Sequence, residues 1–72
     1  MTAIGRALSR ATQSLSTTSD TPRLDAELLM AHALGIERDT LLLSRQDGVV
    51  PSEFGGFIER RKEGEPVAYI TG

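Results

Sequence analysis

The chain has 72 residues, a formal net charge of −2, one histidine and no cysteine. Without cysteine it forms no disulfide and no thiolate metal site, and one histidine cannot build a metal site unaided. Its acidic balance disfavours a dedicated nucleic-acid binder, and no apolar run approaches the roughly 20 residues of a membrane span. We therefore expect one small cytoplasmic domain over residues 1–72, with no metal site and no membrane segment.

The first predicted element is an amphipathic helix near residues 2–15. Its apolar residues recur at helical spacing: Ile4, Leu8, Ala11 and Leu15. The polar run 16–20 that follows is typical of a solvated loop that turns the chain back. The sequence thus predicts one helix with a single apolar face, followed by a connector.

The second predicted helix, near residues 22–34, is the one around which the others should pack. Thr21 or Asp20 can cap its start, and Gly35 can close it in the left-handed conformation. Between Leu24 and Leu34, apolar side chains occupy nearly every side of this helix, so it must be covered on several sides. We expect a central buried helix, Leu24-Leu34, with Leu28 among the most buried residues.

Three shorter helices are predicted in the second half, near residues 37–43, near 52–63, and from Pro66 onward. The three leucines at 41–43 would also suit a short buried strand, but no partner strand is visible, so a helix is favoured. Gly55 and Gly56 should cost about 1 kcal/mol each relative to alanine. Either they allow two helices to approach closely, or the helix begins loosely. The predicted fold class is all-α, a small bundle of four to five helices.

Little in this sequence is suited to catalysis. No glycine-rich phosphate loop follows a strand, and no ligands stand at metal spacing, so we assign no catalytic, cofactor-binding or metal residue. His32 lies two helical turns from Asp25, about 10 Å of rise, which is too far for a direct hydrogen bond. We interpret His32 as a histidine at the rim of the core.

The carboxylate of Asp25 needs a partner if its largely apolar helix is buried. Arg38, Arg60 and Arg61 are candidates, and we predict a structural ion pair between Asp25 and Arg61 or Arg60. A role in holding the fold is favoured over contact with a substrate. Side chains near the C-terminal end could instead contact a partner or another domain: Arg60, Arg61, Lys62, Tyr69 and Ile70.

Two segments also carry a family resemblance. The first is Arg23-Leu24-Asp25-Ala26-Glu27-Leu28-Leu29, followed by His32, Leu34-Gly35 and Arg38. The second is Arg60-Arg61, followed by Gly64-Glu65-Pro66-Val67-Ala68-Tyr69-Ile70-Thr71-Gly72. In this order and spacing they cover about half of the chain, and the Gly-Glu-Pro segment is the more specific. On these residues the chain resembles the N-terminal domain of the HemK/PrmC methyltransferases.

The resemblance implies a helical bundle that precedes a Rossmann-like domain binding S-adenosylmethionine. Enzymes of this family methylate the glutamine of the Gly-Gly-Gln motif in peptide chain release factors. Their catalytic Asn-Pro-Pro-Tyr motif and glycine-rich cofactor loop belong to the second domain, and neither occurs in this sequence. By this resemblance the chain is the substrate-recognition domain. Its partners are then release factors and its own catalytic domain, and S-adenosylmethionine is the cofactor of the full-length enzyme only.

Two alternatives stay open beside this interpretation. The chain could be a self-standing helical interaction module, or a small nucleic-acid-binding helical domain, which the acidic balance disfavours. The apolar segment 67–70 at the end of the chain leads us to expect a neighbouring domain. An Asn-Pro-Pro-Tyr motif downstream of Gly72 would decide for the methyltransferase.

Overall fold

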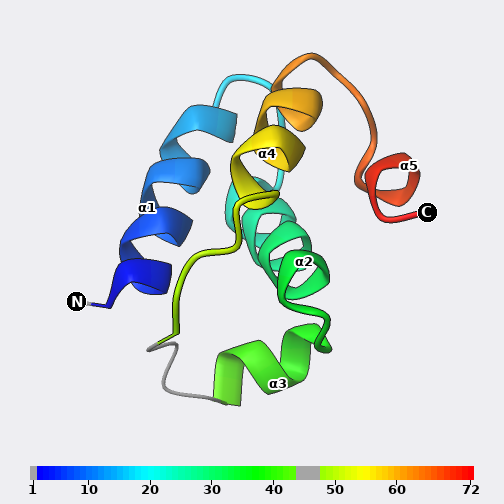
Figure 1. Ribbon diagram of the computed structural model, residues 1–72. Coiled ribbons are helices and arrows are strands. Elements are labelled where there is room, and N and C mark those ends of the chain that lie inside the picture. The colour runs from blue at the N-terminus through cyan, green and yellow to red at the C-terminus, as the bar shows by residue number, and fades with distance from the viewer. Residues whose placement is uncertain (1, 44–47) are drawn as a thin grey trace.

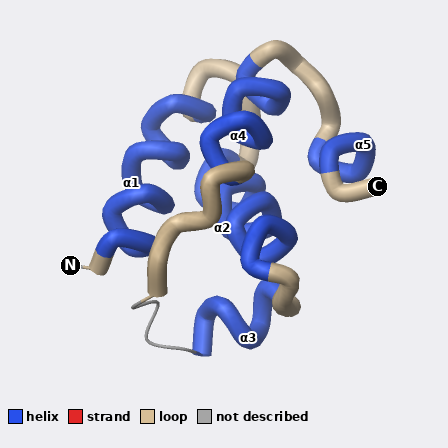
Figure 2. The backbone as a smooth tube through the Cα atoms, viewed as in Figure 1, coloured by secondary structure: helices blue, strands red, loops and turns tan. Residues whose placement is uncertain are grey.

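The computed structural model describes residues 2–43 and 48–72, and every regular element in these ranges is a helix (Figure 2). The elements are α1 (Ala3–Leu15), α2 (Pro22–Leu34), α3 (Arg38–Leu43), α4 (Phe54–Lys62) and α5 (Val67–Ile70). The predicted all-α bundle is confirmed, and every helix boundary that was predicted lies within two residues of the observed one. No helix in the described ranges is long and apolar enough to cross a membrane.

Helix α2 is the centre of the bundle, as predicted. Among the described helices it alone contacts each of the other four. In the view of Figure 1, α1 and α4 stand side by side with α2 behind α4, while α3 lies below and α5 to one side. The α1 face predicted to be apolar packs onto α2, and both helices contribute most of the core, which comprises Ile4, Leu8, Ala11, Leu15, Ala26, Leu29, Met30, Ala31, Leu41, Phe54, Ile58 and Ile70.

Local capping explains where the long helices begin and end. The hydroxyl of Thr2 accepts a hydrogen bond from the backbone N–H of Gly5 at 2.9 Å, so α1 has a side-chain N-cap. Pro22 occupies the first position of α2, where its missing N–H costs nothing. Gly35 closes α2 with φ of +72°, and its N–H donates to the carbonyl of His32 at 3.1 Å. Gly35 thus closes α2 in the left-handed conformation that the sequence predicted.

The expectation that Leu28 is among the most buried residues is wrong. Leu28 is only half-buried, whereas Ala26, Leu29 and Met30 on the same helix are fully buried. Leu24, one turn before Leu28, is exposed. Because α2 is apolar on nearly every side, its pattern could not tell which side would face α1 and α4.

Gly55 and Gly56 are not sites of close helix–helix approach. Both lie in the first turn of α4, which begins at Phe54. A Cβ atom built on either glycine meets no neighbouring atom within 4 Å. Of the two alternatives for this pair, close approach is therefore excluded, and the space beside each glycine is open.

Candidate functional site

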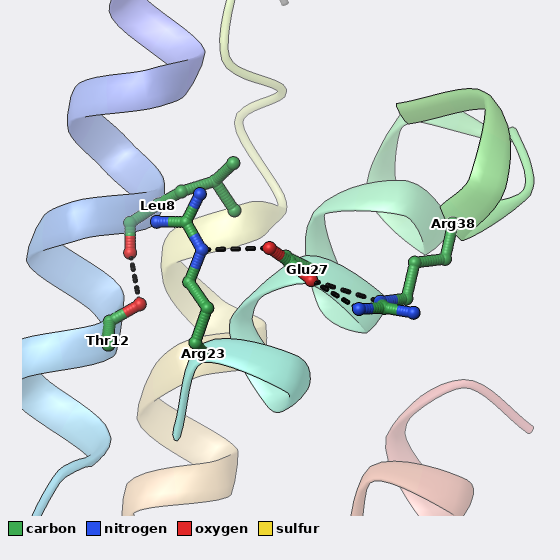
Figure 3. A network of polar contacts seen from close by, with 5 residues as sticks. All are labelled: Leu8, Thr12, Arg23, Glu27 and Arg38. Carbon is green, nitrogen blue, oxygen red and sulfur yellow. Dashed lines mark hydrogen bonds and ion pairs between the residues drawn. The ribbon is translucent and has the colours of Figure 1, made fainter. Parts of the chain in front are cut away.

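Glu27 on α2 lies between two arginines (Figure 3). Arg23 donates from Nε to Glu27 Oε2 at 2.8 Å, and Arg38 donates from Nε and Nη2 to Oε1 at 3.0 and 2.8 Å. The Glu27 side chain is only 7% exposed, so both of its oxygens are bound where water is largely excluded. Arg38, which the sequence offered as a partner of Asp25, thus binds Glu27 and ties the start of α3 to α2.

The two arginines lower the pKa of the Glu27 carboxyl below its ordinary value. Burial is the largest single influence and acts in the opposite direction, because it disfavours the charged form. The hydrogen bonds from Arg23 and Arg38, with their charges, together outweigh burial. Glu27 is therefore a carboxylate at neutral pH, held for structure and not poised to exchange protons.

Asp25 is the second buried carboxylate of α2, and three side chains bind it. Arg61 donates from Nε to Oδ2 at 2.9 Å, and Ser19 donates from Oγ to the same oxygen at 2.5 Å. Thr21 donates from Oγ1 to Oδ1 at 3.2 Å, and its side chain makes no N-cap hydrogen bond. Of the two arginines named from the sequence, Arg61 is the one that contacts Asp25.

The position of Ser19 contradicts the prediction made for the connector between α1 and α2. Residues 16–20 were expected to form a solvated loop, but Ser19 is 7% exposed and its hydroxyl faces Asp25. The connector also touches α4, because the Thr18 hydroxyl donates to the Lys62 carbonyl at 3.4 Å. The loop is thus part of the Asp25–Arg61 junction.

The C-terminal residues proposed as a contact surface are placed differently from one another. Arg60 binds Glu65 through two hydrogen bonds, and Lys62 Nζ lies 3.5 Å from Glu59 Oε1. Tyr69 is 75% exposed, whereas Ile70 is 6% exposed and belongs to the core. Of the two apolar residues in this group, only Tyr69 is accessible to a partner.

A hollow of about 440 Å³ separates parts of α1 and α4. The residues that line it are Ala3, Arg6, Ala7, Arg10, Ala11, Ser14, Val50, Phe54, Gly55, Ile58 and Glu59. Sequence reasoning did not predict this feature. Two signals for it were present: a pair of arginines one turn apart outside the apolar face of α1, and a glycine where α4 could carry a side chain.

A smaller hollow of about 230 Å³ is lined by residues of α2, α5, the segment between α2 and α3, and the first residue of α3, among them Leu28, His32 and Arg38. His32 is exposed, and its ring centroid lies 5.4 Å from that of Phe57, in keeping with a rim position. Arg38 is occupied by Glu27. Within the described ranges, no group of three or more histidine or carboxylate side chains could hold a metal ion.

Comparison with known proteins yields one family. A model of the PrmC N-terminal domain matches residues 6–72. The chain is 44% identical over 69 residues to a protein of Aliivibrio fischeri, covering 90% of the chain and 24% of that protein. It is 39% identical over 75 positions to a protein of Coxiella burnetii, covering 100% of the chain and 27% of that protein.

A third relative, from Pseudomonas aeruginosa, is 47% identical over 58 residues, covering 75% of the chain and 21% of that protein. All three relatives bear the name release factor glutamine methyltransferase. The chain spans about a quarter of the length of these curated relatives. No solved structure matches it significantly. Since the family model covers nearly all of its residues, the chain belongs to the family of PrmC N-terminal domains.

Proposed function

We propose that this chain is the substrate-recognition domain of a cytoplasmic release factor glutamine methyltransferase. The observation that carries the proposal is the family match over residues 6–72, together with the shared name of the relatives. Because the chain spans about a quarter of those relatives, the proposal assigns catalysis to a separate Rossmann-like domain of a longer protein. S-adenosylmethionine would bind to that domain.

The charges that line the larger hollow support this division of labour. The cofactor carries a positively charged sulfonium, and its ribose hydroxyls are typically bound by a carboxylate. The larger hollow offers two arginines, Arg6 and Arg10, and its carboxylate, Glu59, lies beside Lys62. We therefore derive no step of methyl transfer from this chain.

The contribution of the domain would be to binding energy far from the reacting atoms. The amide nitrogen of a glutamine is a poor nucleophile, because its lone pair is shared with the carbonyl group. Such a group must be held in a confined site and in the correct orientation. Remote contacts with a large protein substrate can supply that orientation, whereas a short peptide cannot make them. A helical domain built around α2 is suited to present such contacts.

The test compares two substrates in the full-length enzyme with and without residues 1–72. One substrate is an intact release factor and the other a short Gly-Gly-Gln peptide, and kcat/KM is measured for both. We expect the deletion to lower kcat/KM on the intact protein far more than on the peptide. Circular dichroism and S-adenosylmethionine binding serve as controls that the truncated enzyme is folded. Equal losses of kcat/KM on the two substrates would contradict the recognition role and would indicate that the domain only supports the structure of the enzyme.

A further inference from the structure

The hollow between α1 and α4 has two chemically different parts. Its floor is apolar, because Phe54 and Ile58 of α4 and Ala11 of α1 are core residues. Its upper walls are polar and exposed, with Arg6 and Arg10 on α1 and Glu59 on α4. A ligand in this hollow would thus meet apolar surface below and arginine side chains on one side.

The arginines of the hollow differ from the other basic residues in the described ranges. Arg23, Arg38, Arg60, Arg61 and Lys62 each form an ion pair with a carboxylate of the chain. Arg6 and Arg10 form none within those ranges, although the chain as a whole is acidic. They stand four residues apart on α1, about 6 Å along its axis, so both side chains can reach one ligand. The hollow therefore concentrates uncompensated positive charge in a negatively charged protein.

Gly55 lines the α4 side of the hollow, and it has no side chain that would fill the space. A Cβ atom at this position would meet nothing within 4 Å, so the packing of the chain does not require a glycine there. The φ angle at Gly55 does not lie in the left-handed region, so the backbone does not require glycine either. The missing side chain costs helix stability and leaves open a space that a larger residue would fill.

We propose that this hollow binds an acidic amphipathic helix of the release factor, an inference that rests on the proposed function for the identity of the partner. The apolar face of that helix lies on the floor, and two carboxylates one turn apart pair with Arg6 and Arg10. The lining residues of α1 run from Ala3 to Ser14, about 16 Å or three turns, which suits a helix laid along a groove. Carboxylates spaced i, i+4 on the ligand match the spacing of the two arginines.

A nucleic acid fits the same surface less well. Binding to a phosphate backbone is normally supported by many cationic contacts, whereas this hollow offers two unpaired arginines. The apolar floor of the hollow, formed by Ala11, Phe54 and Ile58, also offers nothing to a phosphate group. The observations therefore favour a protein segment that brings both apolar side chains and carboxylates.

The direct test fills the hollow from the side of Gly55. In the full-length enzyme, Gly55→Leu is compared with Gly56→Leu, which is the matched control. Both glycines lie in the first turn of α4 with open space around them, but only Gly55 lines the hollow. We expect Gly55→Leu to raise the Kd for an unmethylated, intact release factor about tenfold or more, the loss typical of a blocked interface centre. Gly56→Leu should bind like the unaltered enzyme.

A second pair of variants tests the charges. Arg6→Gln/Arg10→Gln is compared with Arg23→Gln/Arg60→Gln, which removes the same number of positive charges from residues whose ion-pair partners, Glu27 and Glu65, do not line the hollow. The first pair should raise the Kd and reduce its dependence on salt concentration, because two charge pairs to the ligand are lost. The control pair should change both quantities much less.

The outcomes separate this inference from the proposed function. If deleting residues 1–72 weakens release factor binding but Gly55→Leu does not, the hollow is not the docking site, and the recognition role stands. If the deletion leaves the Kd unchanged, both fail. If Gly55→Leu and Gly56→Leu weaken binding equally, the inference is overturned. It is also overturned if the arginine variants lose affinity for an RNA oligonucleotide and keep it for the release factor.

Discussion

The acidic side chains of α2 and the basic side chains of α1 differ in burial and in pairing. Asp25 and Glu27 on α2 are buried, and each is bound by an arginine from another part of the chain, Arg61 or Arg38. Arg6 and Arg10 on α1 are exposed and have no ion pair among the described residues. A buried charge without a partner would be costly, whereas an exposed one is solvated by water. The first group is therefore committed to the fold, and the second is free for binding.

The largest expected effect on stability comes from the apolar side chains of α2, the helix that carries the two bound carboxylates. Leu29 is fully buried and Leu28 is half-buried on the same helix. Leu29→Ala should lower the free energy of unfolding by about 2–5 kcal/mol, because it removes contacts and leaves a cavity. Leu28→Ala should cost clearly less. Urea denaturation followed by circular dichroism measures both, and equal losses would contradict the orientation of α2.

The Asp25–Arg61 pair should give the next largest effect. Arg61→Met keeps most of the alkyl chain but leaves the Asp25 carboxylate with only Ser19 and Thr21 as partners. We predict a loss of about 1–3 kcal/mol in the free energy of unfolding, as for a charged group left partly unsatisfied. Arg60→Met is the control, because Arg60 pairs with Glu65 at the surface. If the two variants are equally stable, the Asp25–Arg61 pair does not stabilise the fold.

Glu27 should make stability depend on pH. Its pKa is lower in the folded chain than in the unfolded chain, so its contribution is fully present above the unfolded-state pKa. As pH falls below about 4.3, the unfolded carboxyl takes up a proton first, and the contribution is lost as pH approaches the folded-state pKa. Glu27→Gln should therefore cost about 1 kcal/mol at pH 7, the scale of a partly exposed charge pair, and less near pH 3. Denaturation curves at several pH values measure this difference between the unaltered chain and Glu27→Gln. A difference that stays constant with pH would argue against the linkage.

The smallest effect on stability is expected from substitution of the two arginines that line the hollow between α1 and α4. Arg6→Gln/Arg10→Gln should change the free energy of unfolding by no more than about 0.5 kcal/mol, since neither guanidinium has an ion-pair partner in the described fold. The thermal midpoint of the double variant, beside that of Arg61→Met, is the relevant measurement. A loss as large as that of Arg61→Met would mean that these arginines hold the fold and are not reserved for a ligand.

The helices could be predicted from the sequence because each one carries its own local signals. The spacing of Ile4, Leu8 and Leu15 specifies one face of α1, and Pro22 and Gly35 mark the ends of α2. These signals act within a few residues of the chain, and the segments they define match the observed helices closely. Helix identity and length therefore followed from short-range chemistry.

The orientation of α2 and its polar contacts could not be predicted as well, because they depend on residues far apart. Leu28 was placed in the core because nearly every side of the helix is apolar. Glu27 was overlooked although Arg23, four residues earlier, was a visible partner. Its second partner, Arg38, depends on how Gly35 turns the chain into α3.

The hollow escaped prediction for a different reason. Sequence patterns identify the residues that a helix buries, but they do not reveal the space that two helices leave unfilled. Gly55 was considered as a point of close contact between helices, whereas it borders open space. That distinction requires the positions of α1 and α4, so the candidate binding surface emerged only from the three-dimensional arrangement.

The bond between Arg61 and Asp25 also has a consequence for the rate at which the domain unfolds. It joins residues 36 positions apart and can form only after α4 has returned to α2. Contacts between α1 and α2 span a shorter stretch of chain, so their loop closure costs less entropy. We expect the ion pair to be largely absent from the folding transition state, so that Arg61→Met speeds unfolding and hardly slows folding. Stopped-flow measurements of both rate constants would test this, and a mainly slower folding rate would place the junction in the folding nucleus.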